Sequence, residues 1–121
     1  TVTGFRSNST GMPFYDEMMD NPEYFERAKG LLSKLTMMTP KEYVRKCAEG
    51  FKTTKEKLID QRDKNLAMEY ARKMLDGEKF PILTLDYTRG DFSQEGLHRA
   101  MAAFAAKIPE VPVLIVTRKE E

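Results

Sequence analysis

The sequence contains no tryptophan, one cysteine and one histidine in 121 residues. The single cysteine, Cys47, excludes an internal disulfide bond, and one cysteine with one histidine cannot supply the ligands of a Cys/His zinc site. Such sparing use of cysteine is typical of a reducing compartment, so we expect a cytoplasmic localisation. Cys47 also falls on the apolar side of a predicted helix, which favours an inert buried thiol over a redox centre.

An excess of one charge is also lacking, because 20 lysine and arginine residues face 19 aspartate and glutamate residues. A protein that binds duplex DNA through its net charge usually has a clear basic excess. Any contact with DNA is therefore expected to come from a local patch.

Long apolar runs are missing as well. The longest apolar stretches, residues 101–106 and 111–116, are much shorter than a transmembrane helix, and no signal peptide is recognisable. We therefore expect no contact with a membrane. Because the sequence begins with Thr1 rather than methionine, we expect a larger parent protein among its partners.

The segment from 82 to 116 is the most informative part of the chain because its periodicity changes twice. An apolar run over residues 82–87 predicts a strand, residues 88–91 a turn, and Phe92 a second short strand. A helix is predicted from Gly96 to the prolines at 109 and 112, with its apolar face at Leu97, Met101, Phe104, Ala105 and Ile108. Residues 111–116 then predict a buried strand.

The upstream sequence predicts mainly helices. Residues 1–20 indicate a flexible or docking segment, in which aromatic and methionine side chains gather at 12–19. An amphipathic helix is predicted from the Asn21 cap to Leu35, followed by a short strand at 35–38. A capping box at Thr39 predicts a second helix that ends near Gly50. Residues 54–76 fit one long helix or two shorter ones equally well.

At Gly96 a predicted strand is followed directly by a predicted helix, and an anion can bind at such a helix start. The first N–H groups of a helix have no partner inside it, and a glycine leaves room for a ligand near the backbone. His98 and Arg99 add donors, and the planar guanidinium suits phosphate oxygens. This pattern predicts phosphate recognition; the alternative is a polar first turn that is merely solvated.

Three stretches, Gly77 to Leu83, Glu95 to Ala100 and Ile108 to Val113, resemble the ParB/sulfiredoxin-like superfamily. The resemblance implies an α+β fold, a small mixed sheet flanked by helices, for residues 21–121, with a helical N-terminal extension. It also implies that a Gly-X-X-Arg turn, matched by Gly96, Leu97, His98 and Arg99, meets the phosphates of a nucleotide. The alternative fold is a mostly helical domain with a two-stranded ribbon.

Leu97 departs from both main patterns of that superfamily. It replaces the reactive cysteine of the sulfiredoxin pattern Gly-Cys-His-Arg, so sulfinic acid reduction is not expected. It also replaces the glutamate of the ParB pattern Gly-Glu-Arg-Arg. The remaining resemblance is to stand-alone ParB-like domains of phages and mobile elements, which are often labelled nucleases.

The site expected from these observations binds a nucleoside triphosphate with Mg²⁺. Gly96, Leu97, His98 and Arg99 would contact the nucleotide, Glu95 and His98 are the candidate catalytic residues, and Asp91 and Glu95 are the candidate metal ligands. The plainer explanation of Asp91 and Glu95 is that they favour a turn and the helix dipole. Asp86 flanks the same turn.

Three functions remain open on these grounds. The first is a phosphotransferase, an NTP hydrolase or a DNA-processing domain of a phage or mobile-element protein, in which charge stabilisation carries the chemistry. The second is a non-catalytic adaptor that keeps the fold and docks through residues 12–19. The third is a weak nuclease, for which no cluster of carboxylates argues independently.

Overall fold

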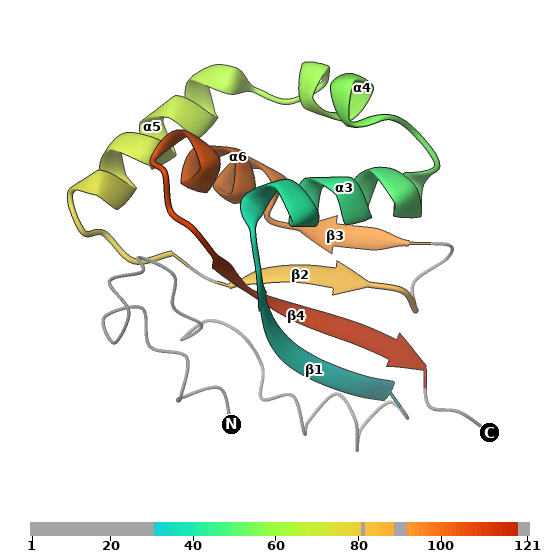
Figure 1. Ribbon diagram of the computed structural model, residues 1–121. Coiled ribbons are helices and arrows are strands. Elements are labelled where there is room, and N and C mark those ends of the chain that lie inside the picture. The colour runs from blue at the N-terminus through green and yellow to red at the C-terminus, as the bar shows by residue number, and fades with distance from the viewer. Residues whose placement is uncertain (1–30, 81, 89–91, 119–121) are drawn as a thin grey trace.

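The computed structural model describes residues 31–80, 82–88 and 92–118 as an α+β fold in which four helices cover one face of a mixed sheet (Figure 1). The expected combination of a small mixed sheet with flanking helices is confirmed. The predicted docking segment, the helix start at Asn21 and the turn at 89–91 lie outside the described residues. In chain order the elements are β1 (Leu31–Met38), α3 (Pro40–Phe51), α4 (Lys55–Asp60), α5 (Lys64–Leu75), β2 (Leu83–Asp86), β3 (Ser93–Glu95), α6 (Leu97–Ala105) and β4 (Val111–Arg118).

The sheet has the strand order β1-β4-β2-β3. β4 runs antiparallel to β1 and parallel to β2, while β3 is an antiparallel edge strand beside β2 with Thr84 opposite Glu95. Since β1 pairs with β4 along its full length, the alternative of a two-stranded ribbon is wrong.

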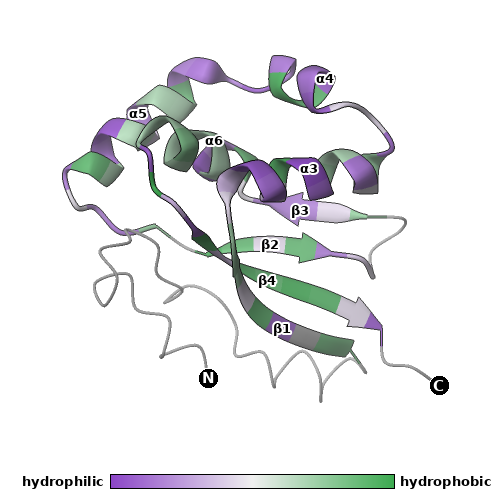
Figure 2. Cartoon of the chain, viewed as in Figure 1, coloured by the Kyte–Doolittle hydropathy of each residue, from purple (hydrophilic) through white to green (hydrophobic). Residues whose placement is uncertain are grey.

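β4 is apolar on both of its faces because it lies inside the sheet. Val111 and Val113 belong to the large cluster under the helices, whereas Leu114 and Val116 belong to a second buried cluster with Ile82. This is the alternation that a pleated strand requires. The apolar colouring of β2 and β4 in Figure 2 shows why the segment 111–116 was recognisable as a buried strand.

The predicted start of α3 is confirmed. The Thr39 hydroxyl accepts a hydrogen bond from the Glu42 N–H at 3.1 Å, and Pro40 occupies the first turn. Gly50, however, does not end the helix, which continues to Phe51. A Cβ on Gly50 would lie 2.5 Å from Cγ of Phe92, so the glycine is needed for close packing against that ring.

The segment 54–76 forms two helices. Thr54 caps α4, and the Asp63 carboxylate caps α5 by accepting from the Leu66 N–H at 3.1 Å. The chain turns at residues 61–63, in the stretch that lacks apolar anchors. The weak apolar pattern there therefore marked a break and not an exposed helical turn.

Two sequence predictions about apolar faces are wrong. Leu31 to Leu35 lie in β1 and not at the end of a helix, because pairing with β4 extends the strand to eight residues. In α6 Leu97 is buried as predicted, but Ala100, Ala102 and Ala103 form the rest of the apolar core side, while Phe104 is 59% exposed. Small side chains let α6 approach its neighbours closely, and the helix ends at Ala105, before the left-handed Lys107 and well before Pro109.

Methionines fill part of the core, because Met38 and Met74 are buried. None of the helices in the described ranges has the length and apolarity needed to cross a membrane.

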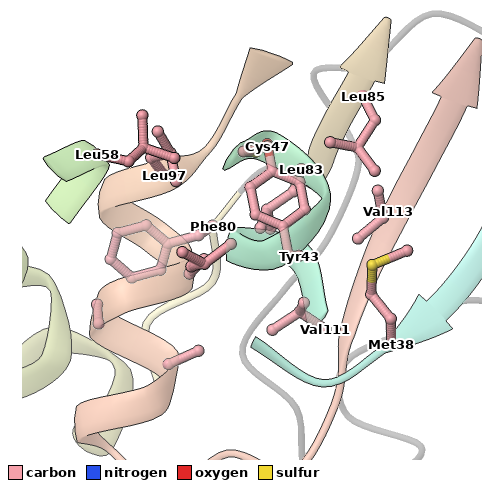
Figure 3. Packing of buried hydrophobic residues seen from close by; sticks show 14 of the residues in the cluster. Met38, Tyr43, Cys47, Leu58, Phe80, Leu83, Leu85, Leu97, Val111 and Val113 are labelled. Atoms are coloured by element: carbon pink, nitrogen blue, oxygen red, sulfur yellow. The ribbon is translucent and has the colours of Figure 1, made fainter. Parts of the chain in front are cut away.

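Tyr43 connects α3 to the edge of the sheet. Figure 3 shows its ring in the core with Leu83 and Val113. Its hydroxyl is within hydrogen-bond distance of the carbonyls of Thr84 (2.8 Å) and Glu95 (3.1 Å) and of Gln94 Oε1 (3.0 Å). Burial holds the pKa of this hydroxyl well above its usual value, so it remains a donor.

We expect Tyr43→Phe to lower the free energy of unfolding by about 1–3 kcal/mol, because buried acceptors would lose their donor. Chemical denaturation monitored by circular dichroism measures this change. The control is Tyr87→Phe, whose ring is exposed and whose effect should stay within about 0.5 kcal/mol. Equal stabilities of the two variants would contradict the role of the Tyr43 hydroxyl.

Candidate functional site

The turn at Gly96 joins β3 directly to α6. Gly96 has φ +132°, a conformation that side-chain-bearing residues rarely adopt, and a Cβ there would lie 2.6 Å from Cγ of Leu83. The glycine is therefore required by its backbone conformation and by close packing against β2. Nη2 of Arg99 lies 3.2 Å from the same Cβ position, which places the guanidinium beneath the turn.

The first turn of α6 is only partly capped. Gln94 Oε1 accepts from the Leu97 N–H at 3.1 Å. Within the described ranges, the N–H groups of His98 and Arg99 have no hydrogen-bond acceptor. Two donors at the positive end of the helix are therefore unpaired within the described part of the chain.

A cavity of about 410 Å³ opens at this turn. It brings together side chains from the α4–α5 connection, from α5, from the segment before β2 and from the β3–α6 turn. The lining residues are Arg62, Tyr70, Phe80, Gln94, Glu95, Gly96, Leu97, His98 and Arg99. All five residues at 95–99 that were predicted as nucleotide-binding or catalytic groups therefore line one cavity.

Arg99 is the most unusual group in this cavity. It is 8% exposed, and its buried Nη2 has no hydrogen-bond acceptor in the described part of the chain. Its nearest anion is Glu95 Oε2 at 3.7 Å, but the Glu95 side chain is 79% exposed, and a contact of that length in solvent contributes little. Burial lowers the pKa of Arg99, with Glu95 opposing the shift. The cation is therefore desolvated without full compensation.

Arg62 is a second guanidinium at the same cavity. Its Nε is buried and lacks a hydrogen-bond acceptor among the residues described. Sequence reasoning missed Arg62, because it lies in a polar stretch with no motif and reaches the cavity only through the packing of the α4–α5 connection beside α6.

His98 faces the α4–α5 connection. Its Nε2 accepts a hydrogen bond from the backbone N–H of Asp63 at 3.2 Å, so the ring proton of this neutral tautomer is on Nδ1. Nε2 is thus occupied by the backbone. The geometry gives His98 a role in attaching residues 61–63 to α6.

The structure describes one of the two candidate metal ligands. Asp91 lies outside the described residues, and Glu95 is the one carboxylate among the cavity-lining residues of the described ranges. Asp86 accepts from the Thr88 N–H at 2.8 Å, shapes the turn after β2 and does not line the cavity. In residues 31–80, 82–88 and 92–118 no group of three or more histidine, cysteine or acidic residues is arranged to hold a metal ion. Two guanidiniums and one carboxylate do not fit a magnesium site.

One wall of the cavity is aromatic. The rings of Tyr70 and Phe80 lie 5.1 Å apart at an angle of 58°, with Phe80 buried and Tyr70 half-buried. An aromatic face beside a cationic end is a combination that suits a ligand with both a ring and a phosphate.

Cys47 does not take part in this site. It is buried, and burial raises the pKa of its thiol to about 12. Because the thiolate is the reactive form, the thiol is inert at neutral pH.

A second hollow of about 440 Å³ has a different character. It lies between α3, α4 and α6, and its apolar lining includes Val44, Ile59, Met101 and the exposed Phe104.

Comparisons of the chain with known protein families, curated proteins and solved structures find no match. The function is therefore argued from the groups in the cavity.

We expect Arg99→Met to raise the free energy of unfolding of the ligand-free protein by about 1–2 kcal/mol, because a similar volume is kept while an uncompensated buried charge is removed. Thermal and urea denaturation provide the measurement. Arg45→Met is the matched control, since Arg45 is exposed on α3 and forms ion pairs with Glu42 and Glu49. A loss of stability in Arg99→Met, larger than in the control, would contradict the assignment.

Proposed function

We propose that the protein binds a nucleotide in the cavity at the Gly96 turn, with a phosphate group beside Arg99. The observation that carries the proposal is the buried Arg99 guanidinium, whose Nη2 has no hydrogen-bond acceptor within the described ranges. A protein rarely desolvates a cation without compensation unless a ligand supplies the missing anion.

The phosphate end of the ligand lies between Arg99 and the start of α6. The free N–H groups of His98 and Arg99 add two neutral donors and the positive end of the helix dipole. Glu95 is too exposed to neutralise Arg99. The positive charge of Arg99 can therefore still attract the phosphate of a ligand.

The base lies against Tyr70 and Phe80. Any base can stack on an aromatic side chain, because every base has a π face. The aromatic wall is what favours a nucleotide over a small inorganic anion. The same ligand class follows from the resemblance of the Gly96 to Arg99 turn to the ParB/sulfiredoxin-like superfamily.

Binding and positioning are supported better than catalysis. Nε2 of His98 is engaged by the Asp63 N–H, and the Glu95 side chain is 79% exposed. These groups therefore support nucleotide binding and give no separate support to magnesium-dependent chemistry.

Isothermal titration calorimetry with ATP, CTP and GTP tests the proposal, with and without magnesium. We expect the wild-type chain to bind at least one of them, and Arg99→Met to weaken that binding by about 10- to 150-fold, as expected for loss of hydrogen bonds to a charged group. Arg45→Met should bind like the wild type. Absence of heat and of thermal stabilisation with all three nucleotides would overturn the proposal.

The aromatic wall is tested separately with Tyr70→Leu and Tyr70→Phe. We expect Tyr70→Leu to weaken nucleotide binding by about 5- to 100-fold through lost stacking, and to leave the affinity for pyrophosphate unchanged. Tyr70→Phe keeps the ring and should keep the affinity. Equal losses for nucleotide and pyrophosphate in Tyr70→Leu would show that the base does not stack there.

A further inference from the structure

We infer that Arg62 is a second phosphate-binding residue of the cavity, held in place by His98, and that the site selects a terminal phosphate with two negative charges. This inference rests on the proposed function and goes further by naming the charge of the ligand. Arg62 and Arg99 come from segments that are 37 positions apart in the sequence, yet both line the same cavity.

The charge of Arg62 has no compensating partner among the residues described. Its Nε is buried without an acceptor. The acidic side chains of its own turn are engaged elsewhere, since Asp60 pairs with Lys64 at 3.6 Å and the Asp63 carboxylate caps α5.

Cys47 does not neutralise Arg62 either. The positive charge of Arg62 acts to lower the pKa of the thiol, but burial outweighs this effect and raises that pKa to about 12. The thiol is therefore neutral where the protein functions. Arg62 is therefore a half-buried cation without an acidic partner among the described residues.

The position of Arg62 depends on His98. The backbone N–H of Arg62 donates to the Ile59 carbonyl at 2.9 Å, and the next N–H, that of Asp63, donates to His98 Nε2 at 3.2 Å. These two hydrogen bonds fix the turn that carries Arg62 against the first turn of α6. His98 is therefore a positioning residue for Arg62.

Two guanidiniums and one exposed carboxylate match a dianion better than a monoanion. A phosphate monoester carries between about 1.5 and 2 negative charges at neutral pH, and each guanidinium brings one positive charge to the cavity. A phosphodiester carries one charge and has fewer free oxygens. The cavity should therefore prefer a nucleotide that ends in a monoester.

A pair of ligands with the same base tests this preference. The two ligands are adenosine 5′-monophosphate and adenosine 3′,5′-cyclic monophosphate, which differ in the charge of the phosphate. If the titrations above favour another base, the corresponding pair with that base is used. We expect the wild type to bind the monoester about 10-fold more tightly than the cyclic diester, as expected for one additional charge-assisted interaction. Arg62→Gln should lose this preference by weakening the monoester alone.

Arg72→Gln is the control, because Arg72 is exposed on α5 and does not line the cavity. It should bind both ligands like the wild type. Equal wild-type affinities for the two ligands, or an unchanged preference in Arg62→Gln, would overturn the inference while nucleotide binding stands. The inference is also overturned if neither monophosphate binds. The proposed function fails only if ATP, CTP and GTP do not bind either.

A double-mutant cycle tests the positioning role of His98. His98→Leu removes the acceptor for the Asp63 N–H and should weaken monoester binding, whereas His98→Gln offers an oxygen near the same place and should restore it. In the His98→Leu background, Arg62→Gln should have little further effect, because Arg62 is no longer held at the ligand. Additive losses, or failure of His98→Gln to restore affinity in a folded protein, would show that His98 does not act through Arg62.

Discussion

The hydrogen bonds between Tyr43, Gln94 and the first turn of α6 hold the turn at Gly96 in place. The Tyr43 hydroxyl reaches Gln94 Oε1 and the Glu95 carbonyl, and the same Gln94 oxygen accepts from the Leu97 N–H. α3, β3 and α6 are thereby joined by one buried polar group. Because the cavity is built on that turn, its shape depends on a side chain that does not line it.

The region around the Gly96 turn contains both satisfied and unsatisfied polar groups. The Tyr43 hydroxyl and Gln94 Oε1 are hydrogen-bonded, whereas Arg62 Nε, Arg99 Nη2 and Thr84 Oγ1 are buried without a partner in the described ranges. Two of these three atoms belong to guanidiniums that line the cavity. Such a difference within one small region argues against poor packing as the cause. Conflicts of this kind are expected at functional sites, where stability is lost for the sake of a ligand.

Local signals in the sequence were reliable where a few neighbouring residues determine the outcome. The Thr39 cap, the glycine at the start of α6 and the buried strand at 111–116 were predicted, because each depends on backbone chemistry within a few positions. Leu31 to Leu35 were assigned to a helix because their spacing fits both periods, and only pairing with β4 decides between them. Arg62 gave no signal, since a hydrogen bond between residues 63 and 98 brings it to the site.

The chain as a whole is nearly neutral, whereas the cavity contains two arginines. This combination is consistent with a small ligand. Recognition of a DNA backbone needs exposed lysines and arginines along a surface, with several phosphates contacted at once. Arg99 is 8% exposed, and it lies beneath the Gly96 turn in a cavity of about 410 Å³. A guanidinium so enclosed can be reached by the phosphate of a nucleotide that enters the cavity, but not by the phosphates of a duplex that remains outside it.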